Sequence, residues 1–139
     1  MDTEKISNIT SDLLDNLEKL IGLIDLSTNQ DFLEVLKLDR AIIYMLVDWS
    51  LPERISRHNV YKALNQLDKK KISLFKINCS NQRKDYVVDW LIRQKENQRD
   101  LYYGGCGETL LIDKGNIVDF IKNPGKLGQR QTKVKLLQW

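Results

Sequence analysis

The sequence has few of the residues on which metal sites, disulfide networks and nucleophilic enzymes depend. Its 139 residues include two cysteines, two prolines and one histidine. The cysteines, Cys79 and Cys106, are too few and too unpatterned for a disulfide framework or a zinc site. No apolar run approaches the ~18 residues of a membrane span, and residues 1–4 lack the basic and apolar segments of a secretory signal. We therefore expect a cytoplasmic protein without a metal, a cofactor or a membrane segment.

Acidic residues are missing from the end of the chain and concentrated at its start. Residues 1–37 hold eight acids against three bases, whereas the chain as a whole carries a net charge of +3. The last 18 residues contain no acid and five bases, which are Lys122, Lys126, Arg130, Lys133 and Lys135. Such a segment could bind nucleic acid or an acidic partner. Because no arginine-rich run or aromatic RNA-binding motif accompanies it, we interpret it as the solvated face of a C-terminal helix.

The most informative stretch covers residues 41–54. It begins as an apolar run of strand length, residues 41–47, and then turns into a helical pattern from Pro52. A mostly apolar strand that leads directly into a helix is typical of a βα unit whose sheet is buried on both faces. Open α/β sheets place their binding sites at the carboxyl ends of such strands. The turn between the two elements is therefore the first place to look for a functional site.

Hydrophobic periodicity predicts the remaining elements. Helices are expected over residues 3–20, after the caps at 27–29, and over 52–67, 85–95 and 126–139. Strands are expected over residues 23–26, 72–79, 109–112 and 117–120, the last two joined by a four-residue hairpin connection. Right-handed crossovers make the first three strands parallel, and the hairpin adds an antiparallel pair. This order predicts a single α/β domain, a three-layer sandwich with a mixed sheet.

Periodicity also assigns side chains to the core. The inner face of the first helix is expected to carry Ile6, Ile9, Leu13, Leu17 and Leu20. Phe32, Leu33 and Leu36 are expected on the inner face of the second helix. The final helix has Leu127, Val134 and Leu137 as its apolar residues, and Met45 and Phe75 are assigned to the centre of the core.

Two motifs resemble those of thioredoxins. The turn reads Trp49-Ser50-Leu51-Pro52-Glu53-Arg54 and resembles the family's Trp-Cys-Gly-Pro-Cys-Lys active-site turn, with the tryptophan and proline in place and both cysteines replaced. Residues 108–115 resemble the family's Pro-Thr-Leu-X-X-Phe-X-X-Gly hairpin, one residue shorter and without the phenylalanine. The resemblance implies a thioredoxin-like α/β/α sandwich with a central mixed sheet over residues 23–139. Residues 1–22 would be an extra N-terminal helical extension.

The departures from the family pattern bear directly on function. Thioredoxin chemistry needs a thiolate at the helix N-terminus and a second thiol three positions on, and these positions are Ser50 and Glu53 here. The family's buried acid aligns with Tyr44, and its cis-proline aligns with Glu108. A cis bond before a non-proline residue costs ~3 kcal/mol, so a trans bond is expected. The resemblance therefore implies that dithiol–disulfide function has been lost.

The residues at the two thiol positions fit a capping box. The Ser50 hydroxyl is expected to accept from the Glu53 N–H, and the Glu53 carboxylate to reach back to the Ser50 N–H, for about 1 kcal/mol of helix stability. A nucleophilic role for Ser50 would need a base. The lone histidine, His58, lies eight residues on, ~12 Å along a continuous helix. A Ser50–His58 pair is therefore excluded if the helix is continuous.

The cysteines and the aromatic residues leave two further questions open. In the resembling fold Cys79 and Cys106 border the former active-site face, so they could pair or act singly as redox-sensing thiols. Inert buried cysteines are the favoured interpretation. Trp49, Tyr102 and Tyr103, with the glycine-rich loop after them, are expected to form an aromatic rim suited to protein contact.

We therefore expect a redox-inactive thioredoxin-fold protein without catalytic residues that binds a protein partner or client, or acts as a scaffold. The binding face would combine the degenerate turn, which consists of Trp49, Ser50, Leu51, Pro52 and Glu53, with a facing loop of Cys106, Gly107, Glu108 and Thr109. A second copy of the chain is one candidate partner, and nucleic acid is disfavoured. The alternatives are a thiol-dependent oxidoreductase or redox sensor using Cys106 or Cys79, or a glutathione-type transferase using Ser50. The missing cis-proline counts against both enzymes.

Overall fold

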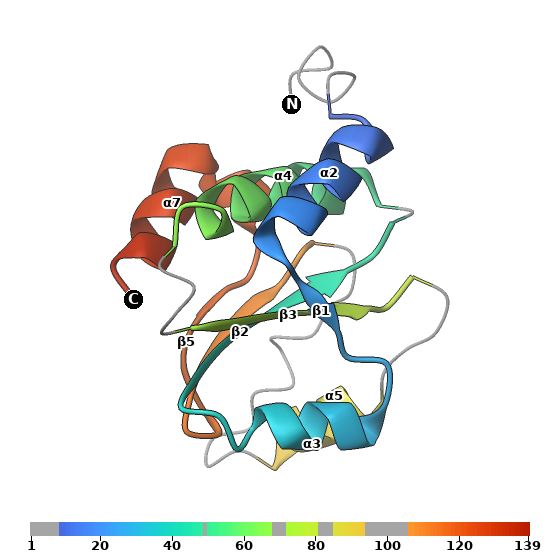
Figure 1. Ribbon diagram of the computed structural model, residues 1–139, viewed down its shortest axis with the longest axis vertical. Helices are drawn as coiled ribbons and strands as arrows, with labels where there is room; N and C mark the ends of the chain where they lie inside the picture. The colour runs from blue at the N-terminus through green and yellow to red at the C-terminus, as the bar shows by residue number, and fades with distance from the viewer. Residues whose placement is uncertain (1–8, 49, 68–71, 81–84, 94–105) are drawn as a thin grey trace.

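A central sheet separates two layers of helices in the computed structural model (Figure 1). The structure describes residues 9–48, 50–67, 72–80, 85–93 and 106–139. The strands are β1 (Ile24–Asp25), β2 (Arg40–Leu46), β3 (Ser73–Asn78), β4 (Thr109–Asp113) and β5 (Asn116–Ile121). The helices are α2 (Ser11–Ile21), α3 (Asn29–Val35), α4 (Leu51–Leu64), α5 (Asp85–Ile92), α6 (Pro124–Leu127) and α7 (Gln129–Leu137). The predicted three-layer α/β sandwich is confirmed.

The sheet has the order β1-β3-β2-β4-β5, with the first three strands parallel and the last two antiparallel to their neighbours. Strand β2 lies at its centre, between β3 and β4. Residues 41–46 of β2 are all buried because helices cover both faces of the sheet at this point. Helices α2, α4 and α7 lie on one face, and α3 and α5 lie on the other (Figure 1). The apolar run over residues 41–47 of the sequence therefore supplies the central strand of the sheet.

The hairpin between β4 and β5 is tighter than predicted. Asp113 and Asn116 pair across the two strands, so the connection consists of Lys114 and Gly115 alone. Both have positive φ, 51° and 82°, which is typical of the two-residue turns whose twist matches that of the strands. The Lys114 N–H donates to the Asp39 carbonyl at 2.8 Å. That bond fastens the hairpin turn to the chain just before β2.

The helix boundaries follow the capping residues of the sequence. Thr10, Thr28, Ser50 and Asn123 each accept a hydrogen bond from the backbone N–H three residues on. Gly22, predicted as the stop of the first helix, has φ 76° and donates to the Glu18 carbonyl. The first eight residues of the chain lie outside the described part of the structure. Of the predicted helix over residues 3–20, residues 9 and 10 are not helical, because Thr10 is the extended N-cap and α2 begins at Ser11.

Two of the predicted inner faces were only partly correct. Ile9 is buried and Leu17 packs against the core, as predicted, but other positions are exposed. In α2 the buried residues are Leu14 and Ile21, whereas Leu13 and Leu20 are 37% and 64% exposed. Each helical residue turns the chain by ~100°, so a face displaced by one residue points to the flank of the helix. Leu13 and Leu20 lie next in sequence to Leu14 and Ile21, so the helix has two apolar faces one residue apart. Packing against α4 buries the second of these faces. In α3, Phe32 is buried as predicted, whereas Leu33 is 42% exposed.

The expected C-terminal helix is divided in two. Gly128 has φ 97° and separates α6 from α7, because a residue with positive φ cannot continue a right-handed helix. The buried residues of α7 are Thr132 and Leu136. The residues that look most apolar in the sequence instead face outward, and these are Leu127, Val134 and Leu137.

The core is divided by the sheet into two parts. Tyr44 packs edge-on against Tyr61 under α4, with ring centroids 5.6 Å apart. On the other face Phe32 packs edge-on against Trp90 at 5.2 Å. Met45 and Phe75 are buried on that second face, as predicted. Within the described residues every helix is too short or too polar to cross a bilayer.

Candidate functional site

The degenerate turn joins the carboxyl end of β2 to the start of α4. The Ser50 hydroxyl accepts from the Glu53 N–H at 3.3 Å, and the Ser50 N–H donates to the Val47 carbonyl at 3.3 Å. Ser50 is buried, whereas Leu51 and Pro52 are exposed. The serine therefore caps the helix as predicted, and the exposed positions of the turn are apolar. Trp49 lies outside the described residues.

Glu53 does not complete the capping box. Its side chain is fully buried and points toward the sheet, where Oε1 accepts from the Tyr44 hydroxyl at 2.7 Å and from Arg57 Nε at 3.0 Å. Oε2 accepts from Arg57 Nη2 at 2.8 Å. A carboxylate whose two oxygens each accept from a different nitrogen of one guanidinium forms a bidentate ion pair, which is strong and directional. We call these three residues the Tyr44–Glu53–Arg57 cluster.

Burial and the contacts among the three residues shift the pKa values of Tyr44, Glu53 and Arg57. Burial raises the pKa of Glu53, an effect that the hydrogen bonds and charge of Arg57 oppose. Burial, and then the charge of Glu53, raise the pKa of Tyr44 well above its usual value. Burial lowers the pKa of Arg57, but its bonds to Glu53 outweigh that effect and the pKa is raised overall. At neutral pH, Tyr44 is thus a neutral donor and Arg57 a cation.

The sequence resemblance aligns this cluster with two functional positions of the thioredoxin family. It aligns Glu53 with the second thiol and Tyr44 with the buried acid. A carboxylate held by Tyr44 and Arg57 has no chemistry for releasing a mixed disulfide. Sequence reasoning missed Arg57, although its spacing from Glu53 is the four residues typical of a helical ion pair. That spacing was the available signal.

Ser50 and the lone histidine, His58, are separated along one helix. Helix α4 is continuous from Leu51 to Leu64. Ser50 and His58 are therefore about two helical turns apart, and the condition that excludes a Ser50–His58 pair is met. His58 is half-buried in the middle of that helix. The turn therefore brings together a capping hydroxyl and a buried ion pair, without a Ser–His arrangement.

The facing loop lies directly against this turn. Gly107 has φ 74°, and a Cβ there would lie 2.5 Å from both the Tyr44 hydroxyl and the Ser56 Cβ. The position therefore requires glycine for conformation and for space. The Glu108 carbonyl accepts from the Met45 N–H at 2.9 Å, which continues the pairing of β2 with β4.

Glu108, which the sequence resemblance aligns with the family's cis-proline, is buried. Its Oε1 accepts from the Cys106 N–H at 3.0 Å, and the Thr109 hydroxyl donates to the Gly107 carbonyl at 3.0 Å. The described residues contain no cis peptide bond, as expected for a glutamate at this position. Local side-chain bonds thus shape a loop that the family shapes with proline.

Neither Cys79 nor Cys106 forms a disulfide within the described part of the chain. Cys79 follows β3 and donates its N–H to the Leu46 carbonyl at 2.7 Å. Burial and then the charge of Glu108 raise the pKa of Cys106, while Lys122 lowers it to a smaller extent. Reactive cysteines have lowered pKa values because the thiolate is the nucleophile. The environment of Cys106 shifts its pKa in the opposite direction.

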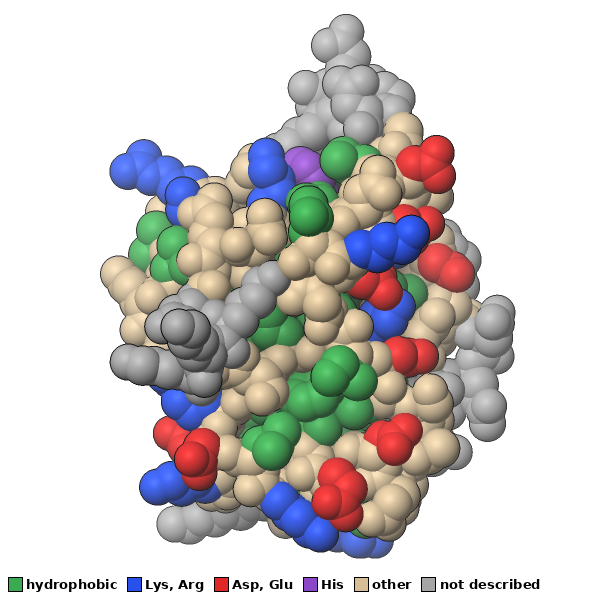
Figure 2. Space-filling view, viewed as in Figure 1, with side chains coloured by type: hydrophobic (Ala, Val, Ile, Leu, Met, Phe, Trp, Pro, Cys, Tyr) green, Lys and Arg blue, Asp and Glu red, His purple; other side chains and the backbone are tan. Residues whose placement is uncertain are grey.

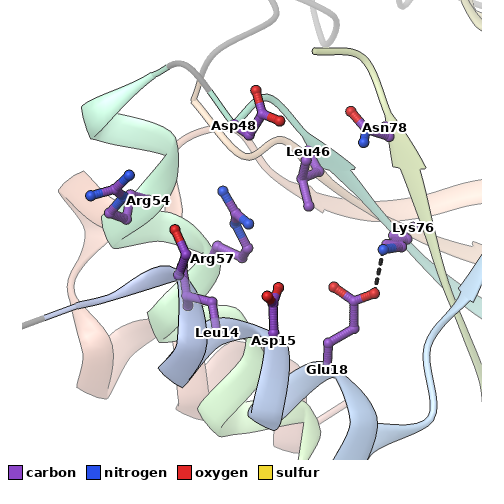
Figure 3. A pocket seen from close by; sticks show the side chains of 10 residues that line it. Leu14, Asp15, Glu18, Leu46, Asp48, Arg54, Arg57, Lys76 and Asn78 are labelled. Carbon is purple, nitrogen blue, oxygen red and sulfur yellow. Dashed lines mark hydrogen bonds and ion pairs between the residues drawn. The ribbon is translucent and has the colours of Figure 1, made fainter. Parts of the chain in front are cut away.

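A small polar pocket of about 220 Å³ opens beside the turn, between α2 and α4 (Figure 3). Its charged residues are Asp15 and Glu18 from α2, Arg54 and Arg57 from α4, Asp48 after β2, and Lys76 within β3. Glu18 pairs with Lys76 and also accepts from the Tyr61 hydroxyl. Pockets for drug-sized ligands and cofactors occupy about 300–1,000 Å³, so this one is undersized. Local sequence patterns could not indicate this pocket, because the residues that line it are far apart along the chain.

The described residues contain no group of three or more potential ligands placed to hold a metal ion. The aromatic rim expected from Tyr102 and Tyr103 lies outside the described part of the chain. The site that the structure does describe is thus a turn, a facing loop and the buried cluster beneath them.

Helices on both faces of a mixed sheet of this order define a sandwich of the thioredoxin type, and solved structures agree. Thioredoxin from Trypanosoma brucei brucei matches 84% of this chain and 92% of its own, with a TM-score of 0.55 at 14% identity. Thioredoxin from Malassezia sympodialis matches 84% and 91%, with a TM-score of 0.57 at 14% identity. Mitochondrial thioredoxin 3 from Saccharomyces cerevisiae matches 86% and 96%, with a TM-score of 0.54 at 15% identity.

The chain therefore has a thioredoxin fold, as the degenerate motifs predicted. No protein-family model matches the sequence, and no curated protein matches it either. Identities of this size establish the fold alone, so the function has to be argued from the site.

Proposed function

We propose that this chain is a redox-inactive thioredoxin-fold protein that binds a protein partner or client. The binding face consists of residues 50–53 and 106–109. The observation that carries the proposal is the Tyr44–Glu53–Arg57 cluster. A buried, bidentate ion pair stands where the resembling family resolves its mixed disulfide, so the scaffold is kept while the electron-carrying atoms are replaced.

Exposed apolar residues on a rigid support favour binding. Leu51 is 52% exposed at the first position of α4, and Pro52 is exposed beside it. Both are fixed in place, because Ser50 caps the helix beneath them. Binding residues are often carried on such loop ends of a firm scaffold. Trp49 stays a predicted anchor of the face, in keeping with the frequency of tryptophan at interface hot spots.

The enzymatic alternatives have less support from the geometry. A thiol-dependent oxidoreductase or redox sensor would need a reactive Cys106, and burial together with Glu108 raises the pKa of that thiol. A transferase using Ser50 would need a free hydroxyl, and this one accepts the Glu53 N–H. We further propose a cytoplasmic location, the type of compartment that keeps free thiols reduced.

The binding face can be tested by capture from native extract. The full chain is immobilised next to two charged variants of the face, Leu51→Asp and Trp49→Asp. The matched control is Leu38→Asp, because Leu38 is 38% exposed and lies before β2, at the other end of that strand. A partner retained by the native chain and by Leu38→Asp, and lost by both face variants, supports the proposal. Equal capture by all four proteins contradicts it.

A further inference from the structure

The two C-terminal helices carry a surface that is both basic and apolar. Lys126, Arg130 and Lys133 are exposed there, and among them Leu127, Val134 and Leu137 are 43%, 40% and 39% exposed. We call these six residues the α6–α7 surface. Figure 2 shows basic and hydrophobic side chains next to one another over α7, at the left of the view.

This surface adjoins the proposed binding face. The Gly125 N–H donates to Ser56 Oγ at 2.8 Å, and Asn59 Nδ2 donates to the Pro124 carbonyl at 3.1 Å. A Cβ at Gly125 would lie 3.2 Å from the Pro52 carbonyl oxygen. Helix α6 is therefore packed against the first turns of α4, next to the exposed residues of the degenerate turn. The α6 end of the α6–α7 surface therefore lies next to the proposed binding face.

The charges of the α6–α7 surface have no acidic partners within the described structure. Lys135 does pair with an acid, Asp119, at 3.3 Å. Lys126, Arg130 and Lys133 make no such contact among the described residues, and residues 122–139 contain no acid that could supply one. A complementary occupant must therefore bring carboxylates for the bases and apolar side chains for the leucines and the valine.

We propose that the α6–α7 surface docks an acidic amphipathic segment of the protein partner. The proposal rests on the proposed function and names the chemistry of its partner. Arg130, Val134 and Leu137 follow the i, i+4, i+7 spacing of one helical stripe, the arrangement by which a helix meets another helix or a groove. Charge complementarity then sets the orientation and the rate of association.

Nucleic acid and membranes fit this surface less well. Single-stranded nucleic acid binds by stacking on aromatic side chains, and Trp139, the sole aromatic residue after position 121, lies against the Arg40 guanidinium at 4.2 Å. Phosphates would leave the aliphatic side chains without a contact. Interfacial membrane helices bury Trp, Phe or Leu along a strongly amphipathic face, whereas α7 has nine residues and its buried side carries a threonine.

The test uses the full chain and two synthetic peptides. Both are amphipathic helices with a leucine face, one with glutamate and the other with lysine at every polar position. Fluorescence anisotropy is expected to show binding of the glutamate peptide at 50 mM salt, weakening as salt increases. The lysine peptide is expected not to bind. No binding of the glutamate peptide, or equal binding of the two, overturns the proposal.

Charge variants locate the contact. Lys126→Glu with Lys133→Glu is expected to weaken binding of the glutamate peptide about tenfold, since two exposed ion pairs become repulsive. The matched control, Lys19→Glu with Lys114→Glu, changes the net charge equally on exposed positions elsewhere and is expected to leave the affinity unchanged. Equal losses in both double variants would show a non-specific charge effect and overturn the assignment. Circular dichroism confirms that each variant is folded.

Apolar variants and competing ligands complete the experiment. Leu127→Ser with Val134→Ser is expected to weaken binding several-fold, and Leu38→Ser not at all. Tighter binding of a single-stranded oligonucleotide or of phosphatidylserine vesicles than of the glutamate peptide overturns the proposal. A failure of the extract experiment can be distinguished from a failure of the peptide titration. Loss of its partner in the Leu51 and Trp49 variants tests the binding face, whereas the peptide titration tests the α6–α7 surface.

Discussion

Two acid–base pairs with helical spacing show how the same sequence signal acquires different roles. Glu34 and Lys37 form an ion pair of 3.1 Å at the end of α3, with side chains 55% and 70% exposed. Glu53 and Arg57 form one of 2.8 Å at the start of α4, with side chains 0% and 10% exposed. The first pair is screened by water and contributes little. The second is desolvated, so each partner depends on the other.

The difference lies in what surrounds each pair. Helix α3 presents its pair to solvent, while α4 turns Glu53 toward the centre of the sheet and against the Tyr44 hydroxyl. A buried charge without a partner is expensive. The folding of the degenerate turn therefore depends on the Tyr44–Glu53–Arg57 cluster staying paired.

The largest expected effect comes from breaking the buried pair. Glu53→Gln leaves the Arg57 guanidinium buried without a counter-charge and is expected to lower the free energy of unfolding by about 3–5 kcal/mol. Glu34→Gln removes the exposed pair and is expected to cost less than about 1 kcal/mol. Urea unfolding of both variants measures the comparison. Similar losses in the two would contradict the distinction drawn between the pairs.

A second comparison concerns two glycines with nearly the same backbone. Gly22 and Gly107 have φ of 76° and 74°, but a Cβ at Gly22 meets nothing within 4 Å while one at Gly107 meets Tyr44 and Ser56 at 2.5 Å. Gly107→Ala is expected to destabilise by about 3 kcal/mol, from strain and overpacking together. Gly22→Ala is expected to cost about 1 kcal/mol, from the backbone alone. Thermal unfolding that ranks them in the reverse order would refute the close approach of the loop.

The hydroxyl of Tyr44 provides a smaller change within the cluster. Tyr44→Phe keeps the ring and removes the donor to Glu53 at 2.7 Å. Because hydrogen bonds to charged groups contribute more than neutral ones, we expect a loss of about 2 kcal/mol. Tyr61→Phe is the matched control, since its hydroxyl reaches Glu18 at 3.3 Å in a part-buried contact. Chemical denaturation should show the smaller loss of stability for the control. A Tyr44→Phe variant with the same free energy of unfolding as the native chain would count against the cluster.

Much of the fold could be predicted because its signals are local. The run over residues 41–47 indicated the central strand, and Gly22, Thr28 and Ser50 indicated helix ends through their own backbone and side-chain chemistry. The hairpin was predicted from Gly115, although its connection proved shorter. Each of these signals is contained within a few neighbouring residues.

The rest depends on contacts between distant parts of the chain. Leu13 and Leu14 are equally apolar, and only the packing of α2 against α4 buries the second. Glu53 could cap its own helix or enter the core, and the choice follows from the nearby Tyr44 hydroxyl and Arg57 guanidinium. The pocket beside the turn likewise joins α2 to β3 through Glu18 and Lys76. Periodicity carries no information on such pairings.

Insulin reduction in the presence of dithiothreitol tests the central claim most directly, with an active thioredoxin as the positive control. The full chain is expected to precipitate insulin no faster than dithiothreitol alone, because neither Ser50 nor Glu53 can carry the disulfide. Multiple turnovers that disappear in Cys106→Ser or Cys79→Ser would contradict the account and assign catalysis to the remaining thiols.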